Sequence, residues 1–211
     1  LVEMRFLLGD QEMFRQLQIQ LRKKLFKDTA GEFTEAKLAE RDARHLKQGG
    51  QRYMVEPNVK EGKGGLRDLQ SLYWIEKYIN GVFHAEQLVE AGVFSAEEFA
   101  TFEAAQNFLW AVRCHLHLIA NRAMDQLTFE LQVEVAEAMG YRDRGGRRAV
   151  EHFMQAYFRH ATKVGELTRI FLPALEAAQL KKEPVVLRVL RRKPKLKPGF
   201  CVRQNRLALA D

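Results

Sequence analysis

Two long stretches of the chain place apolar residues at alternating spacings of three and four, and this period restricts the possible folds more than any other feature. An α-helix has about 3.6 residues per turn, so such positions form one continuous face. In residues 96–122 the repeating positions are Phe102, Ala105, Leu109, Val112, Leu116, Ile119 and Ala123. In residues 147–178 they are Val150, Met154, Tyr157, Ala161, Val164, Thr168, Phe171 and Leu175. Because both faces must be buried against other helices, we predict an all-α helical bundle.

Shorter elements are expected around these two helices. Helical patterns cover residues 1–27, as one helix or a broken pair, and residues 32–48, about 66–80, 84–91 and 128–139. Ser95 and Glu98 predict a capping box before the first long helix. The strand candidates are a short run at 52–56 and weak runs at 185–190 and 200–209. The prediction is therefore a bundle with one short strand and a Gly-rich loop inserted.

The charge of the chain is concentrated in its C-terminal tail. The net charge is +7, but residues 181–206 contain ten Lys or Arg and one acidic residue, Glu183. Residues 1–180 contain 24 basic and 25 acidic side chains. Because the basic excess belongs to a Pro-interrupted, extended tail and not to the body, a nucleic-acid-binding fold is not indicated.

The remaining composition is that of an ordinary globular domain. No apolar run is long enough to span a bilayer, and the N-terminus does not resemble a signal peptide. Cys114 and Cys201 are the only cysteines, which suits a reducing cytoplasm. The chain begins Leu1-Val2-Glu3-Met4 without an initiator Met, in what already has a helical pattern. We therefore expect it to be a fragment of a longer protein.

The most distinctive motif is the stretch Glu56-Pro57-Asn58-Val59-Lys60-Glu61-Gly62-Lys63-Gly64-Gly65-Leu66-Arg67-Asp68-Leu69-Gln70. A Gly-rich loop that precedes a helix can direct backbone N–H groups and the positive end of the helix dipole at a phosphate. It is not a Walker A loop, because Gly64 follows Gly62-Lys63, and Arg67 replaces the third Gly of a dinucleotide fingerprint. Two interpretations remain: an anion-binding loop, or a structural turn into a helix.

The helix predicted over residues 32–48 is mostly charged. It is either a solvated surface or one edge of an anion site, because residues three and four apart lie on neighbouring turns. The residues of that edge would be Lys37, Arg41, Arg44 and His45.

The segment Arg113-Cys114-His115-Leu116-His117 has the residue types of a metal site but not the geometry. His115 and His117 point about 200° apart on a helix and cannot share an ion. Arg113 and His117 share one edge of the helix, and His115 and Arg122 share another. Either pair could reach a phosphate; a salt bridge between helices or a hydrated surface fits equally well.

Signatures of a complete catalytic centre are missing from the sequence. It contains no GxSxG, HExxH or CxxC motif, no His-Asp dipeptide, and no strand with the paired carboxylates that hold two Mg²⁺ ions in nucleotidyltransferases. No metal site is predicted. The residues indicate binding without catalysis.

The Gly-rich stretch from Glu56 to Leu69 closely resembles the signature of bifunctional PII uridylyltransferase/uridylyl-removing enzymes. Two flanking stretches are similar to that family as well: Ala36–His45, and Leu109–His117 continuing through Arg122 and residues 125–132. Together they cover most of residues 1–180. One departure is Gln126, where the family pattern leads us to expect a basic residue.

The resemblance implies a place in a bacterial, cytoplasmic, multidomain enzyme. In such enzymes a nucleotidyltransferase domain uses Mg²⁺ and UTP to uridylylate the PII signalling protein, and a separate hydrolase domain removes UMP. The resemblance assigns residues 1–30 to the last helix of the transferase domain, 31–180 to the helical domain, and 181–211 to a basic extended linker. This segment lacks the catalytic carboxylates and is expected to be inactive alone.

Within that enzyme, the resemblance gives the Gly-rich loop the role of stabilising the UTP triphosphate. The expected contacts are Lys60, Gly62, Lys63, Gly64, Gly65 and Arg67, and the supporting set is Lys37, Arg41, Arg44, His45, Arg113, His117 and Arg122. Asp68 is expected to be a first-turn helix residue and not a metal ligand. The alternatives are a non-catalytic helical module that docks PII or packs domains together, and the related glutamine synthetase adenylyltransferase, which has a similar Gly-Gly-x-Arg segment.

Overall fold

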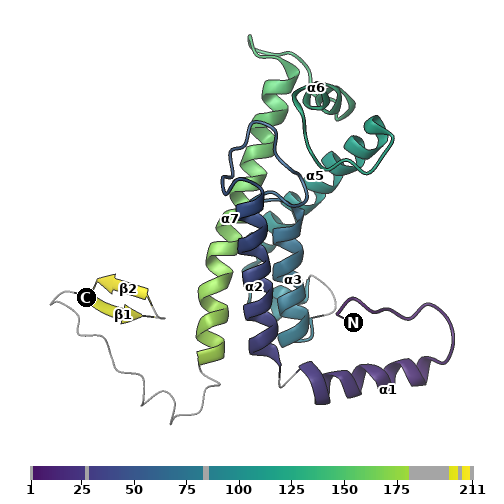
Figure 1. The fold of residues 1–211 in the computed structure, drawn as a ribbon, viewed down its shortest axis with the longest axis vertical. Coiled ribbons are helices and arrows are strands. Elements are labelled where there is room, and N and C mark those ends of the chain that lie inside the picture. The colour runs from purple at the N-terminus through teal and green to yellow at the C-terminus, as the bar shows by residue number, and fades with distance from the viewer. Residues whose placement is uncertain (1, 27–28, 83–85, 181–199, 204–205, 210–211) are drawn as a thin grey trace. The chain divides into compact units, whose positions relative to one another are not determined.

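The computed structural model describes residues 2–26, 29–82, 86–180, 200–203 and 206–209. The chain divides into two compact units, residues 1–168 and 169–211. The first unit contains only helices and loops among its described residues, which confirms the all-α class (Figure 1). Its elements are α1 (Gln11–Leu21), a π-helical turn η1 (Arg22–Phe26), α2 (Ala30–Lys47), α3 (Leu66–Ile79), α4 (Gln87–Glu90), α5 (Ala96–Ala120), α6 (Phe129–Ala138) and the beginning of α7 (Ala149–Leu180).

The second unit contains the end of α7 and a small antiparallel hairpin. Strand β1 (Phe200–Arg203) pairs with β2 (Arg206–Leu209), with Phe200 opposite Leu209 and Val202 opposite Leu207. This hairpin forms in one of the two weak strand runs of the tail, residues 200–209. The other run, 185–190, lies outside the described residues.

Local capping explains where several helices begin and end. The predicted capping box is present: Glu98 N–H donates to Ser95 Oγ at 3.2 Å, and Ser95 N–H donates to the Glu98 carboxylate at 2.7 Å. The helix predicted from residue 1 begins only at Gln11, because Asp10 caps it by accepting from Met13 N–H at 3.0 Å. At the other end of α5, Asn121 adopts a left-handed conformation with φ 49° and stops the helix.

The strand predicted at residues 52–56 does not form. The only ladder contact near it is an isolated bridge between Asn58 and Gln126. Among the described residues no strand lies beside this segment, and side-chain amides bind two of its carbonyls instead. Gln126 donates to the carbonyl of Glu56, and Gln132 donates to the carbonyl of Val55 at 2.8 Å.

The apolar face of α5 is buried as expected over most of its length. Phe102, Ala105, Leu109, Val112 and Leu116 are between 0% and 3% exposed. Ala123 is exposed because the helix ends before it.

The buried face of α7 is offset from the predicted one at two places. Phe153 and Leu167 are buried, whereas their neighbours Met154 and Thr168 are only half-buried. Phe153 lies between Phe108 of α5 and Tyr141, with ring centroids 6.4 and 5.6 Å away. Alternating spacings of three and four do not decide which of two adjacent residues is buried. The Phe153 ring takes the buried position because it fills more space than Met154. The predicted positions Tyr157, Ala161, Val164 and Phe171 are buried, and Val150 is only half-buried. The side chain of Leu175 lies outside the described ones.

Helices α2 and α3 run side by side and are fastened at both ends (Figure 1). At one end the Tyr78 ring of α3 stacks on Phe33 of α2 at 3.9 Å, and its hydroxyl lies 2.6 Å from Thr29 Oγ1. At the other end Arg44 and His45 of α2 contact Asp68 at the start of α3. Because α2 buries only Thr34, these terminal contacts and not a continuous apolar face hold it in place.

The burial of Phe153 in place of Met154 on α7 can be tested by measuring the free energy of unfolding of two variants. We expect Phe153→Ala to lower the free energy of unfolding by about 3–5 kcal/mol, because it removes a fully buried ring and leaves a cavity. Met154→Ala, on the neighbouring half-buried residue, should cost clearly less. Urea denaturation followed by circular dichroism measures both, and equal losses would contradict the observed register.

Candidate functional site

The Gly-rich loop uses almost all of its own backbone amides. The N–H groups of Lys60 and Glu61 donate to the Asn58 side-chain oxygen at 3.1 and 2.7 Å. Those of Gly62, Gly65, Leu66, Arg67 and Asp68 donate to carbonyls within residues 58–65. The N–H of Gly64 donates to the carboxylate of Asp68 at 2.8 Å. The folded loop therefore has the hydrogen bonding of a structural turn, and its amides do not converge on open space.

Close packing explains why glycine occupies the centre of the loop. Gly64 has φ +85°, and a Cβ atom there would lie 2.5 Å from the carbonyl oxygen of Ala161 on α7. A Cβ at Gly62 would lie 2.5 Å from the carbonyl oxygen of Asn58. The backbone of the loop thus packs directly on α7 and on itself, which only glycine permits.

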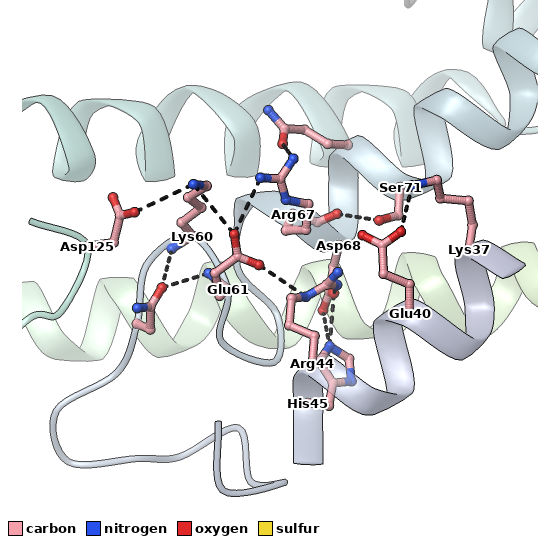
Figure 2. A network of polar contacts seen from close by, with 12 residues as sticks. Lys37, Glu40, Arg44, His45, Lys60, Glu61, Arg67, Asp68, Ser71 and Asp125 are labelled. Atoms are coloured by element: carbon pink, nitrogen blue, oxygen red, sulfur yellow. Dashed lines mark hydrogen bonds and ion pairs between the residues drawn. The ribbon is translucent and has the colours of Figure 1, made fainter. Parts of the chain in front are cut away.

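Asp68 is the buried anion around which the loop and two helices meet. Its carboxylate is 4% exposed and lies 2.5 Å from Arg44 Nη2 and 2.9 Å from His45 Nε2, in addition to the Gly64 N–H (Figure 2). Burial raises the pKa of Asp68, but the hydrogen bond and electrostatic attraction of His45, the Gly64 N–H and the charge of Arg44 outweigh it. The pKa therefore lies below its ordinary value, and the group is a carboxylate at neutral pH.

Asp125 is a second anion, which fastens the loop to α5. Its carboxylate accepts from Arg113 Nε at 2.7 Å and lies 3.1 Å from His117 Nε2. Its carbonyl accepts from Val59 N–H at 2.8 Å. Burial raises the pKa of Asp125, but the hydrogen bonds from Arg113 and His117 lower the pKa by more than burial raises it. The pKa of Asp125 therefore lies below its ordinary value.

Glu61 lies between these two anions in the middle of the basic side chains. Figure 2 shows its carboxylate facing Lys60, Arg67 and Arg44. Lys60 also lies 3.9 Å from Asp125, so the three acids and their cations form one continuous network. The network joins α2, the Gly-rich loop, α3, α5 and the 121–128 connection.

Tryptophan rings stack against two of the arginines. Arg67 lies over the ring of Trp74, and Arg113 over that of Trp110, each at 5.3 Å from the ring centroid. Lys37 also lies 5.3 Å from the Trp74 ring and pairs with Glu40 at 2.6 Å. Such stacking restricts the guanidinium groups to fixed positions.

The structure brings six of the ten predicted basic side chains together; the other four, among them Lys37 with its partner Glu40, form no ion pair with this group among the described residues. Arg44, His45, Lys60, Arg67, Arg113 and His117 belong to the network described above. Arg41 pairs with Asp42, and Arg122 is exposed beyond the end of α5. Lys63 is exposed on the loop and forms no ion pair with the described residues.

Sequence reasoning missed the acids that organise these cations. Glu61 and Asp125 were not predicted to contribute, and Asp68 was expected only to favour its helix dipole. Some of these acids meet cations that are far away in the chain; Lys60 and Asp125, for example, are 65 positions apart. Local spacing in the sequence does not reveal such a contact. The position of Asp68 in the first turn of α3 was the one available signal.

The described residues do not provide a metal centre. No group of three or more His, Cys, Asp or Glu side chains among them is arranged to hold an ion. The acids of the network are occupied by Arg, Lys and His, which are not compatible with a Mg²⁺ site at the same oxygens. No step involving Mg²⁺ is assigned to these residues. Within the same described part of the chain, every helix is too short or too polar to cross a bilayer.

Comparison with known families identifies the class of protein. The profile described as GlnD PII-uridylyltransferase matches residues 32–172, which include the Gly-rich loop and the whole polar network, and the chain belongs to this family. The resemblance inferred from the sequence is thereby confirmed.

Two curated relatives narrow the comparison further. Over all 211 residues the chain is 60% identical to the bifunctional uridylyltransferase/uridylyl-removing enzyme of Ruegeria pomeroyi. It is 58% identical to the enzyme of the same name from Cereibacter sphaeroides. The chain spans 23% of the length of each relative. No solved structure matches the chain significantly.

The role of Asp68 gives a stability prediction with a matched control. Asp68→Asn keeps the size of the side chain but leaves Arg44, which is 9% exposed, without its closest counter-charge. We expect the free energy of unfolding to fall by about 3–5 kcal/mol at neutral pH. Asp42→Asn removes an acid that is 64% exposed beside Arg41, and should cost at most about 1 kcal/mol.

The loss of stability caused by Asp68→Asn should depend on pH, because the pKa of Asp68 is lowered in the folded protein. Its stabilising contribution is fully present above the unfolded-state pKa of about 3.9 and is lost as the pH falls through the lower folded-state value. The gap between the wild type and Asp68→Asn should therefore shrink below about pH 4. Urea denaturation between pH 3 and 7 measures it, and a gap independent of pH would contradict this role.

Proposed function

We propose that the chain is the helical part of an enzyme that transfers a uridylyl group from UTP to the PII signalling protein, with Mg²⁺ held by residues outside the described ones. The observation that carries this proposal is the 58–60% identity to the two bifunctional enzymes over the whole chain. The removal of UMP belongs, in this proposal, to another part of the same enzyme. The location is the bacterial cytoplasm.

The contribution of this segment is electrostatic. During uridylyl transfer the leaving pyrophosphate gains negative charge, and fixed positive groups near it lower the barrier. The loop presents Lys63 on its exposed side, and Lys60 and Arg67 beside it are 30% and 23% exposed. The contacts of the buried Asp68 fix the loop backbone at Gly64, next to Lys63. The amides of Lys60, Glu61, Gly62, Gly64 and Gly65 take no part, because they are satisfied within the turn.

Lys63 gives the sharpest test of this function because it has no structural ion pair to lose. In the complete enzyme, Lys63→Gln should lower kcat/KM for uridylyl transfer by about tenfold, the value of one charge-assisted contact to phosphate. Uridylyl removal should stay within about twofold, since it needs no triphosphate. Steady-state assays of both reactions on the same preparation provide the measurement.

The matched control is Lys163→Gln, the same change on a lysine of α7 that is 51% exposed and pairs only with Glu166. It should leave both activities unchanged. Equal loss of both reactions in Lys63→Gln, or loss of neither, rejects the assignment of the loop to the transfer reaction.

A second candidate function, docking of the PII protein by a non-catalytic surface, is favoured by a different feature. The turn between α6 and α7 exposes Arg142, Arg144, Arg147 and Arg148, and the first three of them line an open hollow of about 790 Å³. None of these side chains forms an ion pair with the described residues. Gly145 and Gly146, with φ 60° and 76°, form the tight turn between Arg144 and Arg147, whose side chains are exposed. A basic surface of this kind fits an acidic protein partner.

The docking surface is testable by charge removal. In the complete enzyme, the double variant Arg144→Gln/Arg147→Gln should raise KM for PII by about five- to tenfold without changing kcat, because rim charges act mainly on association. It should also reduce the salt dependence of KM. The double variant Arg5→Gln/Arg15→Gln removes two exposed arginines of the N-terminal region and serves as the control. Equal effects of the two double variants would reject the surface.

A further inference from the structure

The Glu61 carboxylate is held by three cations, none at an optimal distance. Its oxygens lie 3.3 Å from Arg67 Nη2, 3.5 Å from Lys60 Nζ and 3.6 Å from Arg44 Nε. Charge-assisted hydrogen bonds of this type are usually about 2.7–2.9 Å long. The nearest contacts of Asp68 and Asp125 are 2.5 and 2.7 Å. Glu61 is therefore the loosely bound acid of the network, and its side chain is 28% exposed.

The cations around Glu61 have hydrogen-bonding capacity that the carboxylate does not use. Arg44 is 9% exposed, and its Nε and Nη1 atoms have no hydrogen-bond partner. A buried guanidinium usually has its N–H groups paired, because an unpaired donor costs free energy comparable to a lost hydrogen bond. Two nitrogen atoms of Arg44 are thus unpaired, and one of them, Nε, lies 3.6 Å from Glu61.

The position of these cations is fixed without Glu61. Arg44 is held by Asp68, and Arg67 is held by the Trp74 ring and by Gln70 Oε1 at 3.1 Å. Lys60 has Asp125 as a second, more distant counter-charge. Removal of the Glu61 carboxylate therefore leaves a prearranged site of two guanidinium groups and one ammonium group.

We propose that Arg44, Lys60 and Arg67 form a phosphate-binding site that the Glu61 carboxylate occupies in the ligand-free protein, and that a phosphate group displaces it. The proposal rests on the proposed function in that the natural ligand is the polyphosphate of a nucleotide. It differs from the proposed function in the groups that bind the phosphate, which are three side chains, one of them, Arg44, buried on α2. Because the phosphate must displace the Glu61 carboxylate, the two anions compete for the site.

The chemistry of the site favours phosphate over a carboxylate ligand. A phosphate offers three or more acceptor oxygens in a tetrahedral arrangement, so it can bond to all three cations at once, whereas a carboxylate has only two oxygens. Guanidinium groups pair with phosphate through two parallel bonds. The loose distances to Glu61 are those expected of a two-oxygen anion in a site suited to a larger one.

The test is the affinity for inorganic pyrophosphate, measured by calorimetry on the complete enzyme in EDTA so that metal-dependent binding elsewhere is suppressed. Glu61→Gln removes the competing charge and should tighten pyrophosphate binding by about five- to tenfold. Arg67→Gln should weaken it by a similar factor. Glu134→Gln, the same change on an exposed acid of α6, should leave it unchanged.

Unchanged or weaker pyrophosphate binding by a folded Glu61→Gln variant overturns the proposal. If that variant does not fold, Glu61→Asp replaces it: the shorter side chain holds the cations less well, and an affinity equal to that of the wild type is the overturning result. UTP titrations alongside pyrophosphate distinguish a nucleotide ligand from free pyrophosphate.

Transfer assays separate this inference from the proposed function. Tighter pyrophosphate binding in Glu61→Gln together with unaltered transfer by Lys63→Gln supports the phosphate site and rejects the loop's role in transfer. The reverse pattern rejects the displacement of Glu61 and keeps the transferase function.

Discussion

The carboxylate of Asp68 is the contact on which the first unit of the chain depends most. It accepts from the Gly64 N–H of the loop, from Arg44 and from His45, so one buried anion joins the loop, α2 and α3. Helix α2 buries only Thr34 completely, so this contact and the stacking of Phe33 on Tyr78 at the opposite end hold it beside α3. A buried ion pair is stable only when its remaining donors and acceptors are satisfied, and here Asp68 is fully satisfied while Arg44 is not. The unpaired donors of Arg44 therefore indicate that the phosphate site proposed around Glu61 lies next to the structural contact with Asp68.

The distances within the polar network distinguish the acids that fix the framework from the acid that a ligand can displace. Asp68 and Asp125 hold their arginines at 2.5 and 2.7 Å and fix the framework. Glu61 faces the same group of cations at 3.3–3.6 Å and is partly exposed. Two tryptophan rings, Trp74 and Trp110, contact Arg67 and Arg113. The loop glycines contribute by allowing close packing on α7, so the motif that suggests a phosphate cradle serves to position side chains.

The fold was predictable to the extent that it follows from local pattern. The capping box at Ser95, the apolar face of α5 and the charged character of α2 are all set by residues close together in the chain. The strand at 52–56 was wrong because a strand needs a neighbour to pair with, and only the tertiary arrangement shows that this segment has none. The choice of Phe153 over Met154 was likewise undecided by period alone and depended on the space beside Phe108.

The sequence by itself determined the all-α class, the family and the residue types at the site, because helical period and a long contiguous motif are local properties. It also located the cations. Only the tertiary structure decided which anion each cation meets, because Arg44 with Asp68 and Lys60 with Asp125 are brought together by helix packing over long sequence separations. The same packing turned the loop amides inward and left the open donors on Arg44, so the candidate site moved from the backbone of the loop to the side chains around Glu61.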